Sequence, residues 1–69
     1  MTENEKRARE VLDKALELNI SISKAKCIFA EKPDVQSGKT VWPVLTEKES
    51  IDVAINYPYS WQEVRQAFL

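Results

Sequence analysis

The 69-residue sequence contains no histidine, and this absence excludes many of the common catalytic and metal-binding arrangements. Without histidine there is no Ser-His or Cys-His nucleophile pair, and zinc loses its usual imidazole ligand. The single cysteine, Cys27, cannot form an internal disulfide, and we expect it to be a small buried side chain. No cofactor motif is present. The sequence therefore predicts no catalytic residues, no metal site, no cofactor and no enzymatic activity.

Long apolar runs and a strong charge of either sign are also missing. No run approaches the roughly 20 apolar residues of a membrane helix, and the charged start, M-T-E-N-E-K-R, is not followed by the apolar core of a signal peptide. The net charge is −1, well short of the basic footprint of a nucleic-acid-binding domain. We expect a cytoplasmic protein with no membrane partner, folded as one small globular domain over residues 1–69.

Two amphipathic helices are predicted at the ends of the chain. Residues 3–18 repeat apolar side chains at helical spacing, and Asn19 suits the left-handed position that closes a helix. Residues 61–69 show the same spacing, and Ser60 with Glu63 matches a capping box at their start. A helix of this length is marginal alone, so we expect it to pack on other elements.

Three strands are predicted between these helices. Residues 50–57, S-I-D-V-A-I-N-Y, alternate strictly, which favours a half-buried strand. Residues 40–45, T-V-W-P-V-L, favour a second strand, and Pro43 places it at a sheet edge because proline lacks a backbone donor. Residues 20–31 are ambiguous between a strand, which we favour, and a helix capped by Ser23.

Two signals compete with this assignment. Thr46 and Glu49 match a capping box that would start a helix at residue 47. Residues 11–31 match the spacing of a helix-turn-helix motif, with Asn19 at the turn. Residues 32–39, which include the only glycine, are predicted to be a connecting loop. The favoured fold class is α+β: a three-stranded antiparallel sheet with two helices on one face, in the order α-β-β-β-α.

The function that these features favour is binding to another protein. Two Trp and two Tyr lie between residues 42 and 61, and both residue types are preferred interface anchors. Acidic residues nearby would suit a basic surface. We therefore predict a small regulatory module, such as an inhibitor or an anti-defence protein encoded by a phage or plasmid, that occludes a partner's site. The predicted contact residues are Trp42, Glu47, Glu49, Asp52 and Tyr59.

Two alternatives stay open. The helix-turn-helix interpretation predicts a DNA-binding transcriptional regulator that contacts nucleic acid through Lys24, Lys26 and Lys32. The exposed edge of the predicted sheet would allow a homodimer to form by strand pairing.

Overall fold

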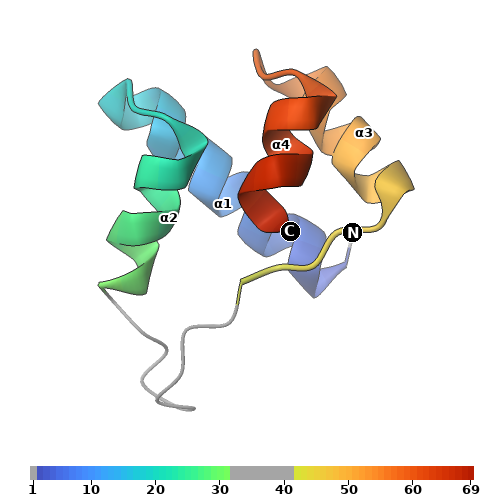
Figure 1. Ribbon diagram of the computed structural model, residues 1–69, viewed down its shortest axis with the longest axis horizontal. Coiled ribbons are helices and arrows are strands. Elements are labelled where there is room, and N and C mark those ends of the chain that lie inside the picture. Colours follow the sequence, from blue (N-terminus) through green and yellow to red (C-terminus); the bar gives the residue numbers. More distant parts are fainter. Residues whose placement is uncertain (1, 32–41) are drawn as a thin grey trace.

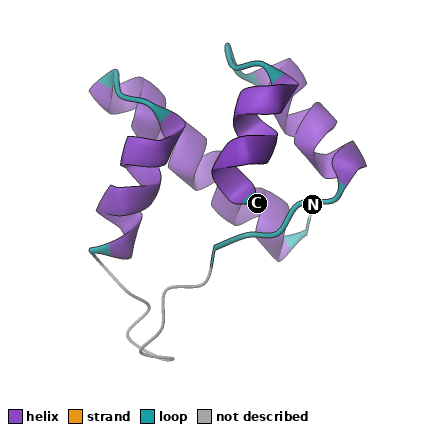
Figure 2. Cartoon of the chain, in the orientation of Figure 1, coloured by secondary structure: helices purple, strands orange, loops and turns teal. Residues whose placement is uncertain are grey.

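The computed structural model describes residues 2–31 and 42–69, and every regular element within them is a helix. The helices are α1 (Glu3–Leu18), α2 (Ile22–Ala30), α3 (Glu47–Asn56) and α4 (Trp61–Phe68) (Figure 1). Figure 2 shows no strand among the described residues. The predicted α+β class, with its antiparallel sheet and its α-β-β-β-α order, is therefore wrong. The described residues also contain no edge strand through which a homodimer could form by strand pairing.

The two terminal helices confirm the sequence prediction. The hydroxyl of Thr2 accepts a hydrogen bond from the backbone N–H of Glu5 at 3.0 Å and so caps α1. Asn19 closes α1 in the left-handed conformation, with φ 53° and ψ 48°. At the start of α4, the hydroxyl of Ser60 accepts from the backbone N–H of Glu63 at 3.2 Å. Local capping chemistry thus sets these boundaries.

The segment that forms α2 was predicted to be a strand, and this prediction is wrong. The helix begins after Ser21 rather than Ser23, because the Ser21 hydroxyl accepts from the backbone N–H of Lys24 at 3.2 Å. Ala25 is buried against the core, whereas Cys27 is exposed. The buried positions of α2 are Ile22 and Ala25, three residues apart as on one face of a helix, and the expectation that Cys27 is buried is also wrong.

The strand predicted over residues 50–57 is replaced by α3, because the capping box prevails over the alternating pattern. The Thr46 hydroxyl accepts from the Glu49 backbone N–H at 3.2 Å, and the Glu49 carboxylate accepts from the Thr46 backbone N–H at 3.3 Å. These bonds satisfy backbone donors that the first turn of a helix would otherwise leave without partners.

The alternating isoleucines do not mark a buried face. Val53 is fully buried, but Ile51 and Ile55 are 42% and 76% exposed. The core-facing positions of α3 are Ser50 and Val53, three residues apart, as expected for one face of a helix. Alternation in this stretch therefore reflects composition rather than strand structure.

Part of the predicted organisation lies outside the described residues. The loop predicted over 32–39 falls there, as do Lys32 and the first two residues of the strand predicted over 40–45. Residues 42–45 have no regular secondary structure and lead into α3.

The core gathers side chains from all four helices into one cluster. α1 contacts α2 and α3, while α4 contacts both α2 and α3 (Figure 1). α1 contributes the largest share of the buried residues, which explains its strong apolar stripe. The buried apolar residues of the helices are Ala8, Val11, Leu12, Ala15, Ile22, Ala25, Val53, Val64, Ala67 and Phe68.

Candidate functional site

A groove runs between α2 and α4. Two adjoining hollows of about 480 and 290 Å³ form it, and both are lined by Ser23, Gln66 and Ala67. Tyr59 lines the larger hollow and Trp42 lines the smaller one, so an aromatic residue stands at each end. In Figure 1, α2 is the green helix and α4 the red one, and the α3–α4 connection and the segment leading to α3 lie at opposite ends of α4.

Lys26 holds the Trp42 end of the groove together. Its ammonium donates a hydrogen bond to the backbone carbonyl of Ala67 in the last turn of α4. The same nitrogen lies 5.2 Å from the centre of the Trp42 ring and 5.6 Å from that of Phe68. Carbonyls in the last turn of a helix lack partners within the helix, and a cation there also suits the helix dipole. Lys26 therefore fastens α2 to α4 and holds Trp42 beside both.

The Tyr59 end carries a carboxylate. Tyr59 is half-buried against the core, and its neighbour Glu63 lines the same hollow. Burial, and then the negative charge of Glu63, raise the pKa of the Tyr59 hydroxyl. The capping box predicted at Ser60 is only half formed, because the Glu63 carboxylate makes no hydrogen bond or ion pair with any described residue.

Three short side chains line the middle of the groove, beside the longer Gln66 of α4. Ser23 and Cys27 face it from α2, and Ala67 faces it from α4. Such side chains leave room for the backbone of another chain to approach closely. Cys27 is the only cysteine of the protein, and its thiol is exposed.

The structure divides the five predicted contact residues into two groups. Trp42 and Tyr59 lie at opposite ends of the groove. The three acidic residues, Glu47, Glu49 and Asp52, lie on α3 and do not line the groove. Glu47 instead lines a separate hollow of about 150 Å³ between α3 and α4. The predicted aromatic anchors and the predicted acidic rim are thus on different surfaces.

The acidic residues of α3 differ in their surroundings. The Glu49 carboxylate accepts a hydrogen bond from the Thr2 hydroxyl as well as from the Thr46 backbone, and these bonds lower its pKa. Glu49 therefore links the start of α1 to the start of α3. Asp52 is exposed, and its backbone carbonyl accepts from the side-chain amide of Asn56 at 2.8 Å.

The lysines predicted to contact DNA lie in different surroundings. Lys24 is exposed on α2, whereas the ammonium of Lys26 is occupied by α4 and two aromatic rings. Lys32 is outside the described residues. Residues 19–21 connect α1 to α2, with Asn19 in the left-handed conformation that the helix-turn-helix interpretation requires at the turn.

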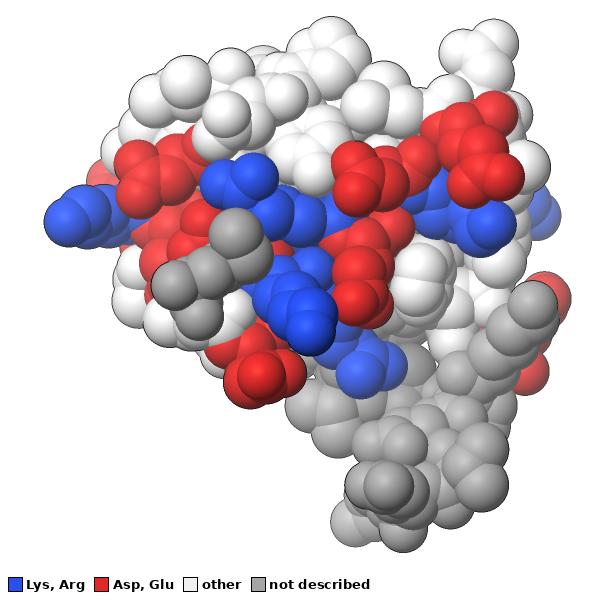
Figure 3. All heavy atoms as spheres, turned by 180° about the vertical axis from the view of Figure 1, so that it is seen from behind, with Lys and Arg blue, Asp and Glu red and all other residues white. Residues whose placement is uncertain are grey.

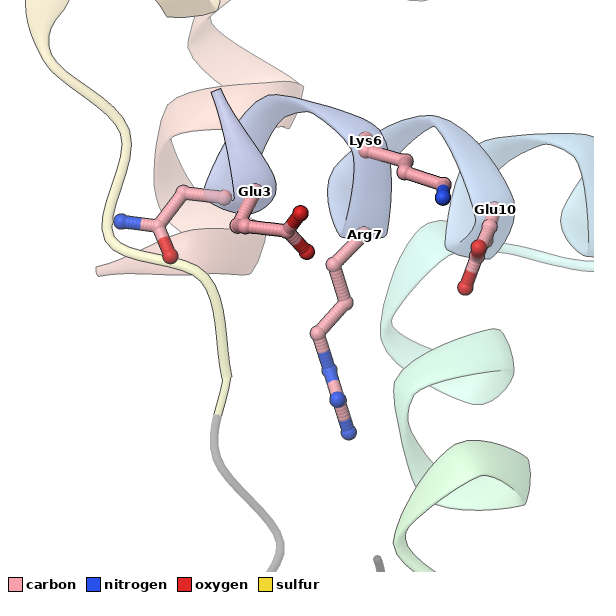
Figure 4. Close-up of a pocket in the computed structure, with 5 residues that line it drawn as sticks. Glu3, Lys6, Arg7 and Glu10 are labelled. Carbon is pink, nitrogen blue, oxygen red and sulfur yellow. The ribbon is translucent and has the colours of Figure 1, made fainter. Parts of the chain in front are cut away.

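The face behind the groove carries charges of both signs. Figure 3 shows basic and acidic side chains interleaved across it. A hollow of about 350 Å³ beside α1 illustrates this balance, since Lys6 and Arg7 line it together with Glu3 and Glu10. In Figure 4 the Arg7 side chain extends away from α1, and the carboxylate of Glu3 lies to one side of it. Interleaved charges of this kind give no strong attraction for a polyanion.

Sequence reasoning identified the two aromatic ends of the groove but missed its walls. Ser23, Cys27, Glu63 and Gln66 face one another only because α2 and α4 are neighbours in the fold. The sequence signal for these walls would have been the polar faces of two amphipathic helices. Because residues 20–31 were predicted to be a strand, the polar face of α2 was not considered.

Metal sites, membrane helices and similarity to known proteins were the remaining features that could point to a function. Within residues 2–31 and 42–69, no three His, Cys, Asp or Glu side chains gather in a way that could hold a metal ion. Among the helices described, none combines the length and the apolar character needed to cross a membrane. No family model, curated protein or solved structure matches this chain.

Proposed function

We propose that this protein is a non-enzymatic binding module that holds a peptide segment of a partner protein in the groove between α2 and α4. The observation that carries the proposal is the pairing of Trp42 and Tyr59 at the two ends of one continuous groove. Aromatic residues of these types anchor protein interfaces more often than other residues. Trp42 and Tyr59 flank a central section of the groove in which Ser23, Cys27 and Ala67 are short side chains.

The dimensions of the groove suit a short segment. The nine residues of α2 correspond to a wall of about 14 Å at 1.5 Å per residue. An extended peptide covers that length with about four residues at roughly 3.3 Å each. Side chains at the two ends of such a segment would contact Tyr59 and Trp42. A partner whose functional segment is held in this way would be occluded, which is the inhibitory action expected from the sequence.

A binding function also fits the chemistry of the groove better than catalysis does. The only thiol, Cys27, is exposed on its wall, but the chain has no histidine to activate it. Ser23 lacks a histidine base for the same reason.

Photocrosslinking from Cys27 tests this proposal directly. Because Cys27 is the sole cysteine, a small diazirine reagent attached to its thiol reports what enters the groove. We expect a specific crosslinked partner from lysate of the native host, and its loss when Ser23→Arg fills the groove. The matched control carries the same reagent on α3, in a Cys27→Ser, Asp52→Cys protein. Equal crosslinking from both positions, or crosslinking that Ser23→Arg does not reduce, would contradict the proposal. Circular dichroism confirms that the variants remain folded.

A DNA-binding regulator is the second candidate, and the connection between α1 and α2 is the observation that favours it. Its turn contains a left-handed Asn19, and Lys24 projects from the helix that would enter the major groove. A mobility-shift assay at low salt tests it. Binding that is abolished by Lys24→Glu and that falls steeply with salt would support this function. Failure to retard any DNA at low salt would exclude it.

A further inference from the structure

Glu63 differs from two other glutamates that stand three residues after a hydroxyl N-cap, Glu49 and Glu5, the second of which pairs with Arg9. Glu49 and Glu63 both stand three residues after a hydroxyl N-cap, and in both the backbone N–H donates to that cap. The Glu49 carboxylate then bonds back to Thr46, whereas the Glu63 carboxylate has no hydrogen-bond or ion-pair partner among the residues described. Its carboxylate therefore forms no bond that closes a capping box, although its charge lies in the first turn of α4, where the helix dipole favours an anion.

This carboxylate belongs to the wall of the larger hollow of the groove. The hollow is about 480 Å³, and no basic side chain is among the described residues that line it. The nearest arginine along α4, Arg65, is engaged elsewhere, because its guanidinium lies 5.1 Å from the centre of the Trp61 ring. The Tyr59 ring and the Ser21 hydroxyl lie at the same end of the groove as Glu63. This end therefore offers a negative charge, an aromatic ring and a hydroxyl acceptor.

The opposite end has the reverse character. The ammonium of Lys26 lies between the Trp42 ring and the carbonyl of Ala67, and it lines the smaller hollow. The Lys26 ammonium would repel a second cation there, whereas an apolar side chain can pack on the Trp42 indole ring. The two ends of the groove thus differ in charge along its length.

We infer that the groove selects a peptide segment with a lysine or arginine at the Tyr59–Glu63 end and an apolar side chain at the Trp42 end. A cation placed near Glu63 gains an ion pair and, over the Tyr59 ring, a cation–π contact. The same charge arrangement sets the direction in which the segment lies. This inference rests on the proposed binding function and specifies the partner's chemistry.

The test uses a random twelve-residue peptide library displayed on phage. Peptides are selected on the wild-type protein and counter-selected on Ser23→Trp, which fills the groove without adding a charge, so that only groove binders remain. We expect the enriched sequences to share a lysine or arginine a few residues from an aromatic or aliphatic residue. Their synthetic forms should lose affinity about 1.5- to fivefold with Glu63→Gln, in the range of an exposed ion pair. Replacing the basic residue of the peptide by norleucine should cause a similar loss.

The matched control is Asp52→Asn, which removes one exposed negative charge from α3, away from the groove. It should leave peptide affinity unchanged at constant salt. If groove binders carry no basic residue, or if Glu63→Gln and Asp52→Asn have equal effects, the inference is overturned while the binding function stands. If no peptide distinguishes the wild type from Ser23→Trp, the proposed function itself fails, and this inference fails with it.

Discussion

Removing the charge of Lys26 should destabilise the whole domain, because this ammonium joins three segments. Lys26→Met keeps the apolar stem of the side chain but eliminates the hydrogen bond to the Ala67 carbonyl and the contacts with the Trp42 and Phe68 rings. A hydrogen bond from a charged donor contributes about 1.5–3 kcal/mol, and each exposed cation–π contact about 0.5–1 kcal/mol. Together these contacts would contribute about 2.5–5 kcal/mol, and because solvent screens the half-buried Lys26, we expect a loss slightly below that range. The free energy of unfolding should fall by about 2 kcal/mol.

Urea denaturation followed by circular dichroism measures this loss, and thermal unfolding gives a second reading. For a domain of this size, 2 kcal/mol corresponds to a fall in Tm of roughly 8–16 °C. The control is Lys24→Met, since Lys24 is on the same helix but exposed. Hydrogen exchange should also show faster opening of the last turn of α4 in Lys26→Met alone. If the two variants unfold within about 0.5 kcal/mol of each other, the contacts of Lys26 do not hold α2 to α4.

Two further predictions concern pH. The hydrogen bonds that lower the pKa of Glu49 below its ordinary 4.5 stabilise the fold above that pH, so this stability should disappear on acidification. In acid unfolding between pH 6 and 3, Glu49→Gln should therefore depend less steeply on pH, and an unchanged slope would contradict the assignment. Tyr57 donates a hydrogen bond to the Asp13 carboxylate at 2.8 Å, and burial first, then this bond, raise its pKa to about 12. The neutral hydroxyl stabilises the fold fully below pH 10 and less as the pH rises towards 12, so Tyr57→Phe should reduce the alkaline loss of stability. Identical unfolding profiles for Tyr57→Phe and the wild type between pH 9 and 12 would refute this.

The α3 segment shows why a strong periodic pattern can mislead. Its β-branched residues alternate as in a half-buried strand, but only Val53 of the three reaches the core. Nothing in the local sequence states which side chains will be buried, because burial depends on where α1 and α4 pass. The cap formed by Thr46 and Glu49 depends only on neighbours three residues apart, so it was the more reliable signal.

The sequence by itself determined the features that depend on near neighbours. These are the extent of α1, its left-handed end at Asn19, the start of α4 after Ser60, and the exclusion of histidine chemistry. Each follows from hydrogen bonds or side-chain spacing within one or two helical turns. The aromatic residues at 42 and 59 were also identifiable as candidates from their chemistry alone.

Only the tertiary structure decided which of these local features meet. Packing on the core turned the ambiguous stretch into α2, and it placed α2 beside α4 so that Ser23 and Gln66 face one groove. The packing of α2 on α4 also brings the Lys26 ammonium to the carbonyl of Ala67 at the end of α4. The Glu63 carboxylate has no partner among the described residues. The placement of α2 beside α4 and the bond from Lys26 to Ala67 join residues 40 or more positions apart, and the spacing of neighbouring residues does not reveal such contacts.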